Sequence, residues 1–246
     1  MRSTIKASKS RWLLPALLLT LFLASVLLSQ ELARLLAAFL PHKEIFAERT
    51  PLPILALQHI MLVAAASGLA LLVAVGVAIL TRLPSFQHIK TYLLHAASFG
   101  QTIPTVAVLA ILVPVLGYGL KPILFALFLY GVLPVLRNTI EGLDTVPAEI
   151  TESAKAMGMN TLQTLFLVEL PMARPAMMAG LQTSIILNIS VATVGAVVGV
   201  NGFGTLIING IRADDIVLLL KGAIPVALLA LTVDSLFSAG KQRNIM

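Results

Sequence analysis

Six apolar runs dominate this sequence, and all but the fourth are long enough to cross a lipid bilayer as a helix. The fourth is short and is expected to borrow flanking turns. The hydrocarbon core is about 30 Å thick, so about 20 apolar residues make one helical crossing. The runs extend over residues 12–28, 54–80, 93–116, 122–136, 176–200 and 216–237. Because a lipid-exposed backbone must satisfy its own hydrogen bonds, the runs predict an all-α fold, a polytopic transmembrane helical bundle of about six spans.

Composition limits what else the chain can contain. Of the 246 residues, 58% are hydrophobic and only 11% are charged, whereas soluble domains carry about 25% charged residues. A chain of this length has no room for a large soluble domain beside the spans. We therefore expect residues 1–50 to hold an N-terminal tail, the first span and an outer linker, and residues 51–246 to form one membrane core. The absence of cysteine excludes disulfides and cysteine-based metal sites.

The positive residues indicate how the spans are oriented. With the amino terminus inside, 11 lysines and arginines fall on the inner face and 6 on the outer face, in the direction of the positive-inside rule. This predicts a multi-pass protein of the cell inner (cytoplasmic) membrane with cytoplasmic N and C termini. The basic start of the first run is also typical of a cleaved signal peptide, but its apolar stretch is long for one. We expect this run to be retained as a span.

The longest interruption on the predicted inner side covers residues 137–175 and has a helical pattern. Apolar or small residues recur at spacings of three and four, namely Ile150, Ser153, Ala154 and Met157. Pro147 fits the first turn of this helix, with Asp144 or Thr145 as its cap. Gly158 is expected to end the helix, since glycine adopts the left-handed conformation at low cost.

A second short helix is predicted after this glycine. Asn160 can cap it, with Gln163 three residues later in a capping-box arrangement. Pro171 is expected to stop it, because the residue before a proline avoids the α region. Either helix alone could simply lie on the membrane surface, so a more specific role depends on the whole pattern.

Eight residues of this loop have a spacing found in a known family. They are Glu152, Ser153, Ala154, Gly158, Val168, Glu169, Leu170 and Pro171. The segment resembles the EAA loop of binding-protein-dependent ABC permeases, whose pattern is E-A-A, three residues, G, nine residues and I-x-L-P. The spacing agrees throughout. Ser153 replaces an alanine and Val168 an isoleucine.

A second resemblance narrows the family. The segments at residues 100–104, 112–119 and 129–139 are similar to permeases of the osmoprotectant class, which import glycine betaine, choline, carnitine and related quaternary amines. The resemblance implies the type I ABC importer permease fold and a transport subunit rather than an enzyme. A permease of the same fold for another small solute, such as an amino acid or another organic cation, remains an alternative.

The family resemblance also implies the roles of individual residues. In this family the E-A-A segment forms a coupling helix that sits in a groove of the ATPase subunit. The ATPase-coupling residues carried over are Glu152, Ser153, Ala154, Gly158, Leu170 and Pro171. Glu152 is the expected ionic contact with an arginine of the ATPase.

The family resemblance also implies partners for this chain. It has no G-x-x-x-x-G-K-[ST] phosphate loop, so ATP and Mg are expected on partner ATPase subunits and no cofactor on this chain. The resemblance also implies a periplasmic or lipid-anchored substrate-binding protein and a second permease, either an identical copy or a paralogue. Membrane lipid surrounds the spans, and no nucleic-acid partner is expected.

Polar residues inside the runs are candidates for the translocation path. Gln101, Thr102 and Pro104 lie in the third run and Asn188 in the fifth, and Pro104 is expected to free a backbone carbonyl there. Hydrogen bonding between helices is the alternative for each of them. Asp214 and Asp215 are interpreted as part of a solvated loop.

Two other function classes fit the sequence less well. A secondary transporter without an ATPase would be expected to carry buried charges or broken helices at mid-membrane. The runs are nearly free of charge before Asp234, which counts against this class. An intramembrane enzyme is disfavoured because no Ser/His, His/Glu or paired-aspartate arrangement appears at bilayer depth.

Overall fold

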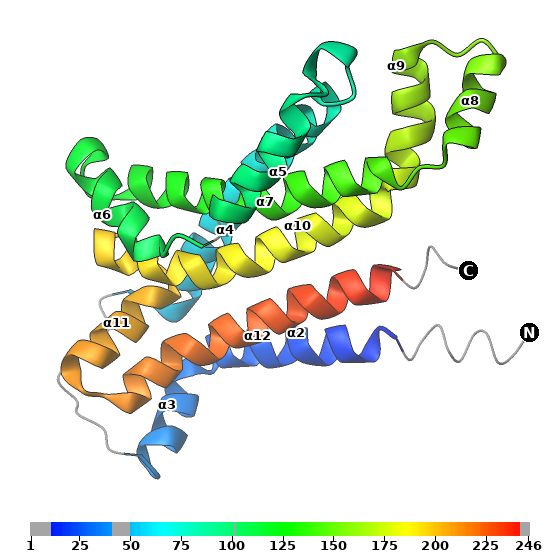
Figure 1. The fold of residues 1–246 in the computed structure, drawn as a ribbon. Helices are drawn as coiled ribbons and strands as arrows, with labels where there is room; N and C mark the ends of the chain where they lie inside the picture. Colours follow the sequence, from blue (N-terminus) through cyan, green and yellow to red (C-terminus); the bar gives the residue numbers. More distant parts are fainter. Residues whose placement is uncertain (1–10, 41–49, 101, 242–246) are drawn as a thin grey trace, which may run out of the picture. The chain divides into compact units, whose positions relative to one another are not determined.

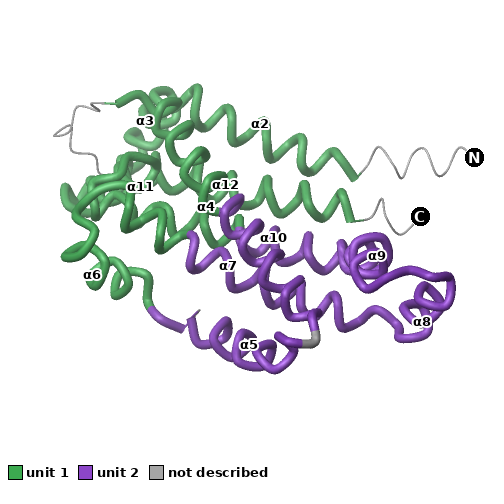
Figure 2. The backbone as a smooth tube through the Cα atoms, turned by 90° about the horizontal axis from the view of Figure 1, so that it is seen from above, with its two compact units in different colours: residues 1–66, 104–127, 185–246 green, residues 67–103, 128–184 purple. Residues whose placement is uncertain are grey.

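The computed structural model describes residues 11–40, 50–100 and 102–241, which form helices and short turns without a strand among them (Figure 1). These residues fold into two compact units (Figure 2). Unit 1 comprises residues 1–66, 104–127 and 185–246, and unit 2 comprises residues 67–103 and 128–184. The predicted division at residue 50 does not coincide with a boundary between the units.

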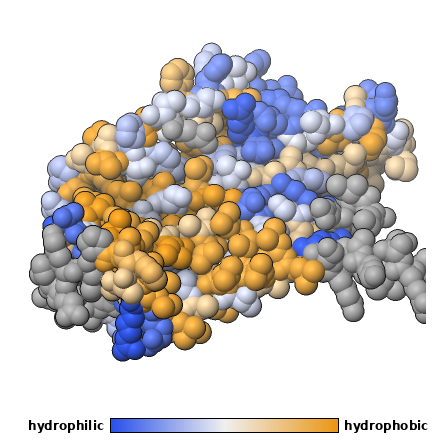
Figure 3. All heavy atoms as spheres, turned by 90° about the horizontal axis from the view of Figure 1, so that it is seen from below, coloured by the Kyte–Doolittle hydropathy of each residue, from blue (hydrophilic) through white to orange (hydrophobic). Residues whose placement is uncertain are grey.

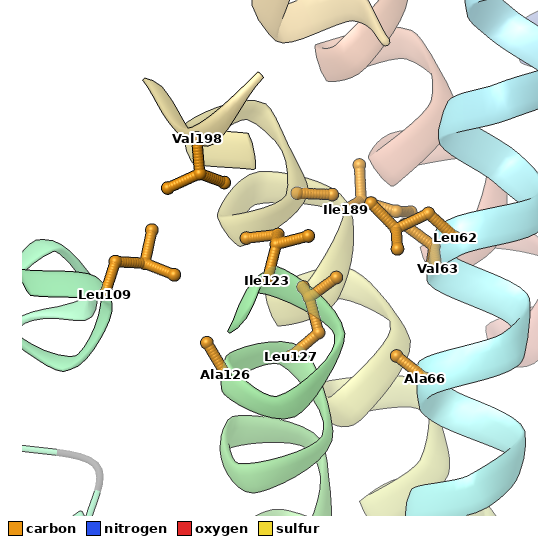
Figure 4. Packing of buried hydrophobic residues seen from close by; sticks show 10 residues of the cluster. Leu62, Val63, Ala66, Leu109, Ile123, Ala126, Leu127, Ile189 and Val198 are labelled. Carbon is orange, nitrogen blue, oxygen red and sulfur yellow. The ribbon is translucent and has the colours of Figure 1, made fainter. Parts of the chain in front are cut away.

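Three long helices contribute to both units, namely α4 (Leu52–Leu80), α7 (Leu120–Asp144) and α10 (Leu170–Ala192). Unit 1 also contains α2 (Leu13–Leu27), α3 (Ser29–Ala37), α6 (Thr105–Leu116), the 3-10 segment η3 (Thr193–Val198), α11 (Phe203–Ala213) and α12 (Ile216–Lys241). Here α12 packs against both α2 and α11. An apolar cluster that includes Leu62, Ile123 and Ile189 joins α4, α7 and α10 (Figure 4).

Unit 2 contains the loops and helices around the interruption at residues 137–175. Its elements are η1 (Pro84–Phe86), α5 (Ile89–Gly100), α8 (Ala148–Ala156), α9 (Thr161–Thr164) and the π turn η2 (Leu165–Glu169), together with parts of α4, α7 and α10. Its core joins Ala78 of α4, Ile140 of α7 and Ala173 of α10, with Leu165 of the π turn packed against them.

The length and hydropathy of the helices confirm the predicted membrane bundle. Among the described residues, four helical stretches are long and apolar enough to cross a membrane: α4, α7, residues 161–198 and α12. There are two bent pairs, α2 with α3 and α5 with α6, and the number of candidate spans among the described residues rises to six if each pair counts as one span. Broad apolar patches on the face seen in Figure 3 fit helices that contact lipid.

The third predicted span, residues 93–116, is wrong as a single helix. The helix is interrupted between α5 and α6, and Pro104 is not inside a helix but precedes α6 in an extended conformation, with φ −62° and ψ 134°. Proline has no N–H to donate and suits a position where a helix begins. Thr102 lies in the intervening turn and donates from Oγ1 to the carbonyl of Phe99 over 2.7 Å. Gln101 lies outside the described residues.

The predicted stop at Pro171 is also wrong, because α9 continues through η2 into α10. In the π turn, the N–H of Leu170 donates to the carbonyl of Leu165, five residues earlier. This shift of the hydrogen-bond ladder comes just before the proline, which then occupies the first turn of α10, where a missing N–H is tolerated. Residues 161–198 therefore form one helical stretch.

Two further segments expected to be loops are ordered. Part of the predicted outer linker forms the helix α3, in which Arg34 pairs with Glu31 over 2.7 Å. Asp215 is buried rather than solvated, and its Oδ1 accepts from the N–H groups of Val217 and Leu218 at 3.0 and 3.1 Å. This carboxylate therefore caps the start of α12.

Helices α7 and α10, which flank the connecting segment in sequence, pack closely against each other. A Cβ at Gly142 of α7 would lie 2.6 Å from the Cβ of Ala176, and one at Gly180 of α10 would lie 2.8 Å from the carbonyl oxygen of Pro134. No side chain fits at either place. The two glycines let the backbones approach closely, as small residues do between membrane helices.

We predict that Gly142→Ala destabilises the protein by about 1–3 kcal/mol, because the added methyl group forces α7 and α10 apart. Thermal unfolding of the purified protein in detergent measures the change as a lower melting temperature. Gly68→Ala in α4 is the matched control, since its Cβ would meet nothing within 4 Å. An equal effect of both substitutions on the melting temperature would contradict the packing argument.

Candidate functional site

The segment between α7 and α10, residues 145–169, is called the connecting loop below. Its helices α8 and α9 form a hairpin that projects beyond the ends of α7 and α10 (Figure 1). Pro147 precedes α8 in an extended conformation instead of lying in its first turn, and no side chain caps the helix. The predicted caps are engaged elsewhere, because Asp144 forms ion pairs and Thr145 donates from Oγ1 to the carbonyl of Gly142.

The predicted end of the first loop helix at Gly158 is confirmed. Gly158 has a left-handed φ of +88°. Its N–H donates to the carbonyl of Lys155 over 2.9 Å, and the N–H of Met159 donates to the carbonyl of Ala154 over 3.1 Å. These two bonds form a Schellman motif, which satisfies the last carbonyls of α8 and turns the chain sharply.

The predicted capping box at the start of the second loop helix is confirmed as well. The side-chain oxygen of Asn160 accepts from the N–H of Gln163 over 2.8 Å, and the Gln163 side chain accepts from the N–H of Asn160 over 2.9 Å. The helix end at Gly158 and this cap lie only two residues apart. The tip of the hairpin is therefore defined by local hydrogen bonds.

The residues predicted to couple with an ATPase do not all lie on one surface. Ala154 is only 2% exposed and is packed inward. Glu152 and Ser153 are exposed, and the Ser153 hydroxyl donates to the carbonyl of Glu149. Leu170 and Pro171 belong to the start of α10, the former half-buried and the latter exposed.

The hairpin carries exposed carboxylates, among them Glu152, together with exposed apolar side chains. Among the described residues Glu152 has no hydrogen-bond or ion-pair partner. Met157 is 75% and Leu167 64% exposed, and Leu162 and Phe166 are more than half exposed. Exposed apolar side chains in the connecting loop mark a protein contact more than a solvated surface. We call these five residues the hairpin surface.

Sequence reasoning missed a charged cluster at the base of the connecting loop. It joins Arg82, Lys90, Asp144 and Glu169 beside a cavity of about 470 Å³. Arg82 and Lys90 entered the sequence argument only as topology signals. A signal was present, since each of these charges stands at or within a few residues of a helix end.

The predicted path residues that the structure describes differ in their exposure. Thr102 and Pro104 are exposed, whereas Asn188 is completely buried in unit 1 and thus packed between helices. The described residues also contain no group of three or more His, Cys, Asp or Glu side chains that could hold a metal ion. The translocation path stays a prediction.

Comparison with known proteins agrees with the family resemblance of the sequence. Residues 73–244 match the family of binding-protein-dependent transport system inner membrane components. The osmoprotectant import permease protein OsmW of Salmonella typhimurium is 38% identical over 73% of this chain and 85% of its own length. The carnitine transport permease protein OpuCB of Listeria monocytogenes is 39% identical over 75% of this chain and 83% of its own.

Solved structures bear out the fold. The MetNI methionine ABC transporter in an inward-facing conformation aligns with a TM-score of 0.66 at 15% identity, over 80% of this chain and 99% of that chain. An amino acid ABC transporter aligns with a TM-score of 0.61 at 17% identity, over 78% and 92% of the two chains. The predicted type I importer permease fold is confirmed.

We predict that Gly158→Ala weakens the hairpin tip by about 1–2 kcal/mol, because a side chain is strained at this φ. Space is not the cause, since a Cβ there would meet nothing within 4 Å. Hydrogen exchange at the amides of Gly158 and Met159 measures the change and should be about tenfold faster. Gly158→Asn should change the exchange rate much less, since asparagine visits this conformation. Equal exchange in all three proteins would contradict the role of the left-handed residue.

Proposed function

We propose, from the premise that this chain belongs to the family of binding-protein-dependent transport system inner membrane components, that it is the permease subunit of an ATP-driven importer. The observation that carries the proposal is the hairpin surface, in which Glu152, without a partner among the described residues, and exposed apolar side chains share a loop of defined shape. On this view the hairpin faces the cytoplasm, and both chain termini lie on the same side.

The partner that best fits the hairpin surface is a nucleotide-hydrolysing subunit. The chain itself has no phosphate loop, so ATP and Mg are bound by that subunit. Glu152 supplies an ionic contact, and the apolar side chains Met157 and Leu167 fill a groove around it. An ion pair shielded by such an apolar rim contributes more than an exposed one.

Coupling residues fall into two groups under this proposal. Glu152 touches the ATPase directly, together with the backbone around the exposed Ser153. Ala154 and Gly158 act by shape, because the first packs α8 onto the rest of the loop and the second ends it. Leu170 and Pro171 connect the loop to α10. When two ATPase subunits close, a hairpin held in this way moves as one piece.

The proposed substrates are osmoprotectants of the quaternary-amine class, including glycine betaine, choline and carnitine. The support is the names of the relatives, which are osmoprotectant and carnitine permeases. A substrate-binding protein outside the membrane delivers the solute, and a second permease, identical or paralogous, supplies the other coupling loop. The proposal includes a translocation path at Gln101, Thr102 and Pro104. The burial of Asn188 favours a packing role for that residue instead.

We predict that Glu152→Lys reduces ATPase binding to this chain by about tenfold, because a like charge faces the ATPase arginine. The lysine disturbs nothing inside the chain, since the side chain is exposed and partnerless among the described residues. Co-purification of tagged permease with its ATPase measures the change. Glu31→Lys in α3 is the control for a charge change elsewhere. ATPase recovery that is unchanged by Glu152→Lys would contradict docking at this surface.

The substrate assignment is tested separately with proteoliposomes that contain the permease, its ATPase and its binding protein. We predict ATP-dependent uptake of radiolabelled glycine betaine, choline or carnitine, with no uptake of methionine. Uptake of methionine but of none of the three amines would contradict the assignment and favour another small solute. Uptake that continues without the ATPase would favour a secondary transporter.

A further inference from the structure

Four charged residues at the base of the connecting loop form one cluster, which we call the basal cluster. Arg82 follows the end of α4 by two residues, Lys90 lies in the first turn of α5, Asp144 ends α7 and Glu169 directly precedes α10. All four lie in unit 2 and are only partly exposed. None belongs to the hairpin surface.

Arg82 contacts both ends of the connecting loop at once. Its Nη1 lies 3.5 Å from Oδ1 of Asp144, just before the loop, and its Nε lies 3.3 Å from Oε2 of Glu169, the last residue of the loop. The Nε–Oε2 contact is an ion pair without hydrogen-bond alignment. Arg82 also donates from Nη2 to the carbonyl of Leu143, and Lys90 pairs with the second carboxylate oxygen of Asp144.

The chemistry of the guanidinium explains why arginine suits this position. Its rigid planar fork carries five donors and can serve several acceptors at the same time, whereas lysine offers one point charge. The Glu169 side chain is 17% and the Arg82 side chain 29% exposed, so water screens this pair less than a surface pair. Removal of Arg82 would leave Glu169 as a shielded charge without its counterion.

The basal cluster holds helices and loop together, and we do not interpret it as a ligand site. The adjacent cavity is lined by Arg82, Lys90, Asp144 and Glu169, but these charges already oppose one another within it. What the contacts do is join α4 and α5 to the two ends of the loop. Without them, a force on the hairpin could bend the loop without moving those helices.

We propose that Arg82 is a positioning residue for transport, which holds both ends of the connecting loop so that movement of the hairpin is passed to α4 and α5. The proposal rests on the proposed docking of an ATPase on the hairpin. It assigns a role to a residue that lies outside the loop and does not touch the ATPase. Arg82 therefore matters for the efficiency of coupling and not for ATPase binding.

The position of the hairpin can be measured directly, because the chain contains no cysteine. Spin labels at Ser85→Cys and Glu149→Cys, both exposed, report the distance between the α4–α5 turn and α8. In the full complex we expect a narrow distance distribution, which Arg82→Gln or the isosteric Glu169→Gln broadens. Arg137→Gln is the matched control, since Arg137 pairs with Glu141 within α7 alone. An unchanged distribution in both test variants would overturn the proposal.

A second readout separates positioning from docking. In proteoliposomes with glycine betaine and choline as probes, Arg82→Gln should retain its ATPase but transport about fivefold fewer molecules per ATP hydrolysed. The double variant Arg82→Gln/Glu169→Gln should be no worse than Arg82→Gln alone, because Arg82→Gln already removes the Arg82–Glu169 contact. Additive losses, or an unchanged ratio, would overturn the role of Arg82. Failure of the unmodified chain to bind any ATPase would instead overturn the proposed function.

Discussion

The close packing of α7 against α10 is the contact on which the connecting loop depends. At Gly142 and Gly180 the two backbones approach so closely that a methyl group has no room. Because these helices flank the loop in sequence, their contact sets the separation of the loop's two ends. An apolar core shared with α4 and with Leu165 of the π turn extends that contact to the base of the hairpin. The loop is thereby built on rigid helices.

The shape of the hairpin comes from local backbone chemistry, and the function we propose for it rests on the side chains that it leaves exposed. Gly158 and the Asn160–Gln163 capping box satisfy the polar groups at the tip. Ala154 turns inward, which leaves Glu152 and several apolar side chains on the outside. A surface of this kind on a membrane protein without a nucleotide-binding loop fits a docking site for a separate ATPase. The basal cluster then connects this site to helices beyond the loop.

Features that depend on neighbouring residues in sequence could be predicted, and features that depend on distant contacts could not. The spans, the end of α8 and the second helix cap follow from hydropathy and turn chemistry. Pro104 and Pro171 were misjudged, because a proline can begin a helix or follow a π turn, and that choice depends on tertiary packing. The ion pairs of Arg82 join residues 62 and 87 positions apart, and although each charge lies near a helix end, the sequence does not show which charges meet.

The central claim is that the hairpin contacts an ATPase, and a single engineered cysteine tests it most directly. Met157 at the exposed end of α8 is the position of choice in a chain that has no other cysteine. A bifunctional thiol-reactive reagent applied to the membrane complex should link Met157→Cys to the ATPase subunit, and ATP should change the yield of that product. Linkage to the substrate-binding protein instead, or modification of this cysteine only from outside the cell, would contradict the account.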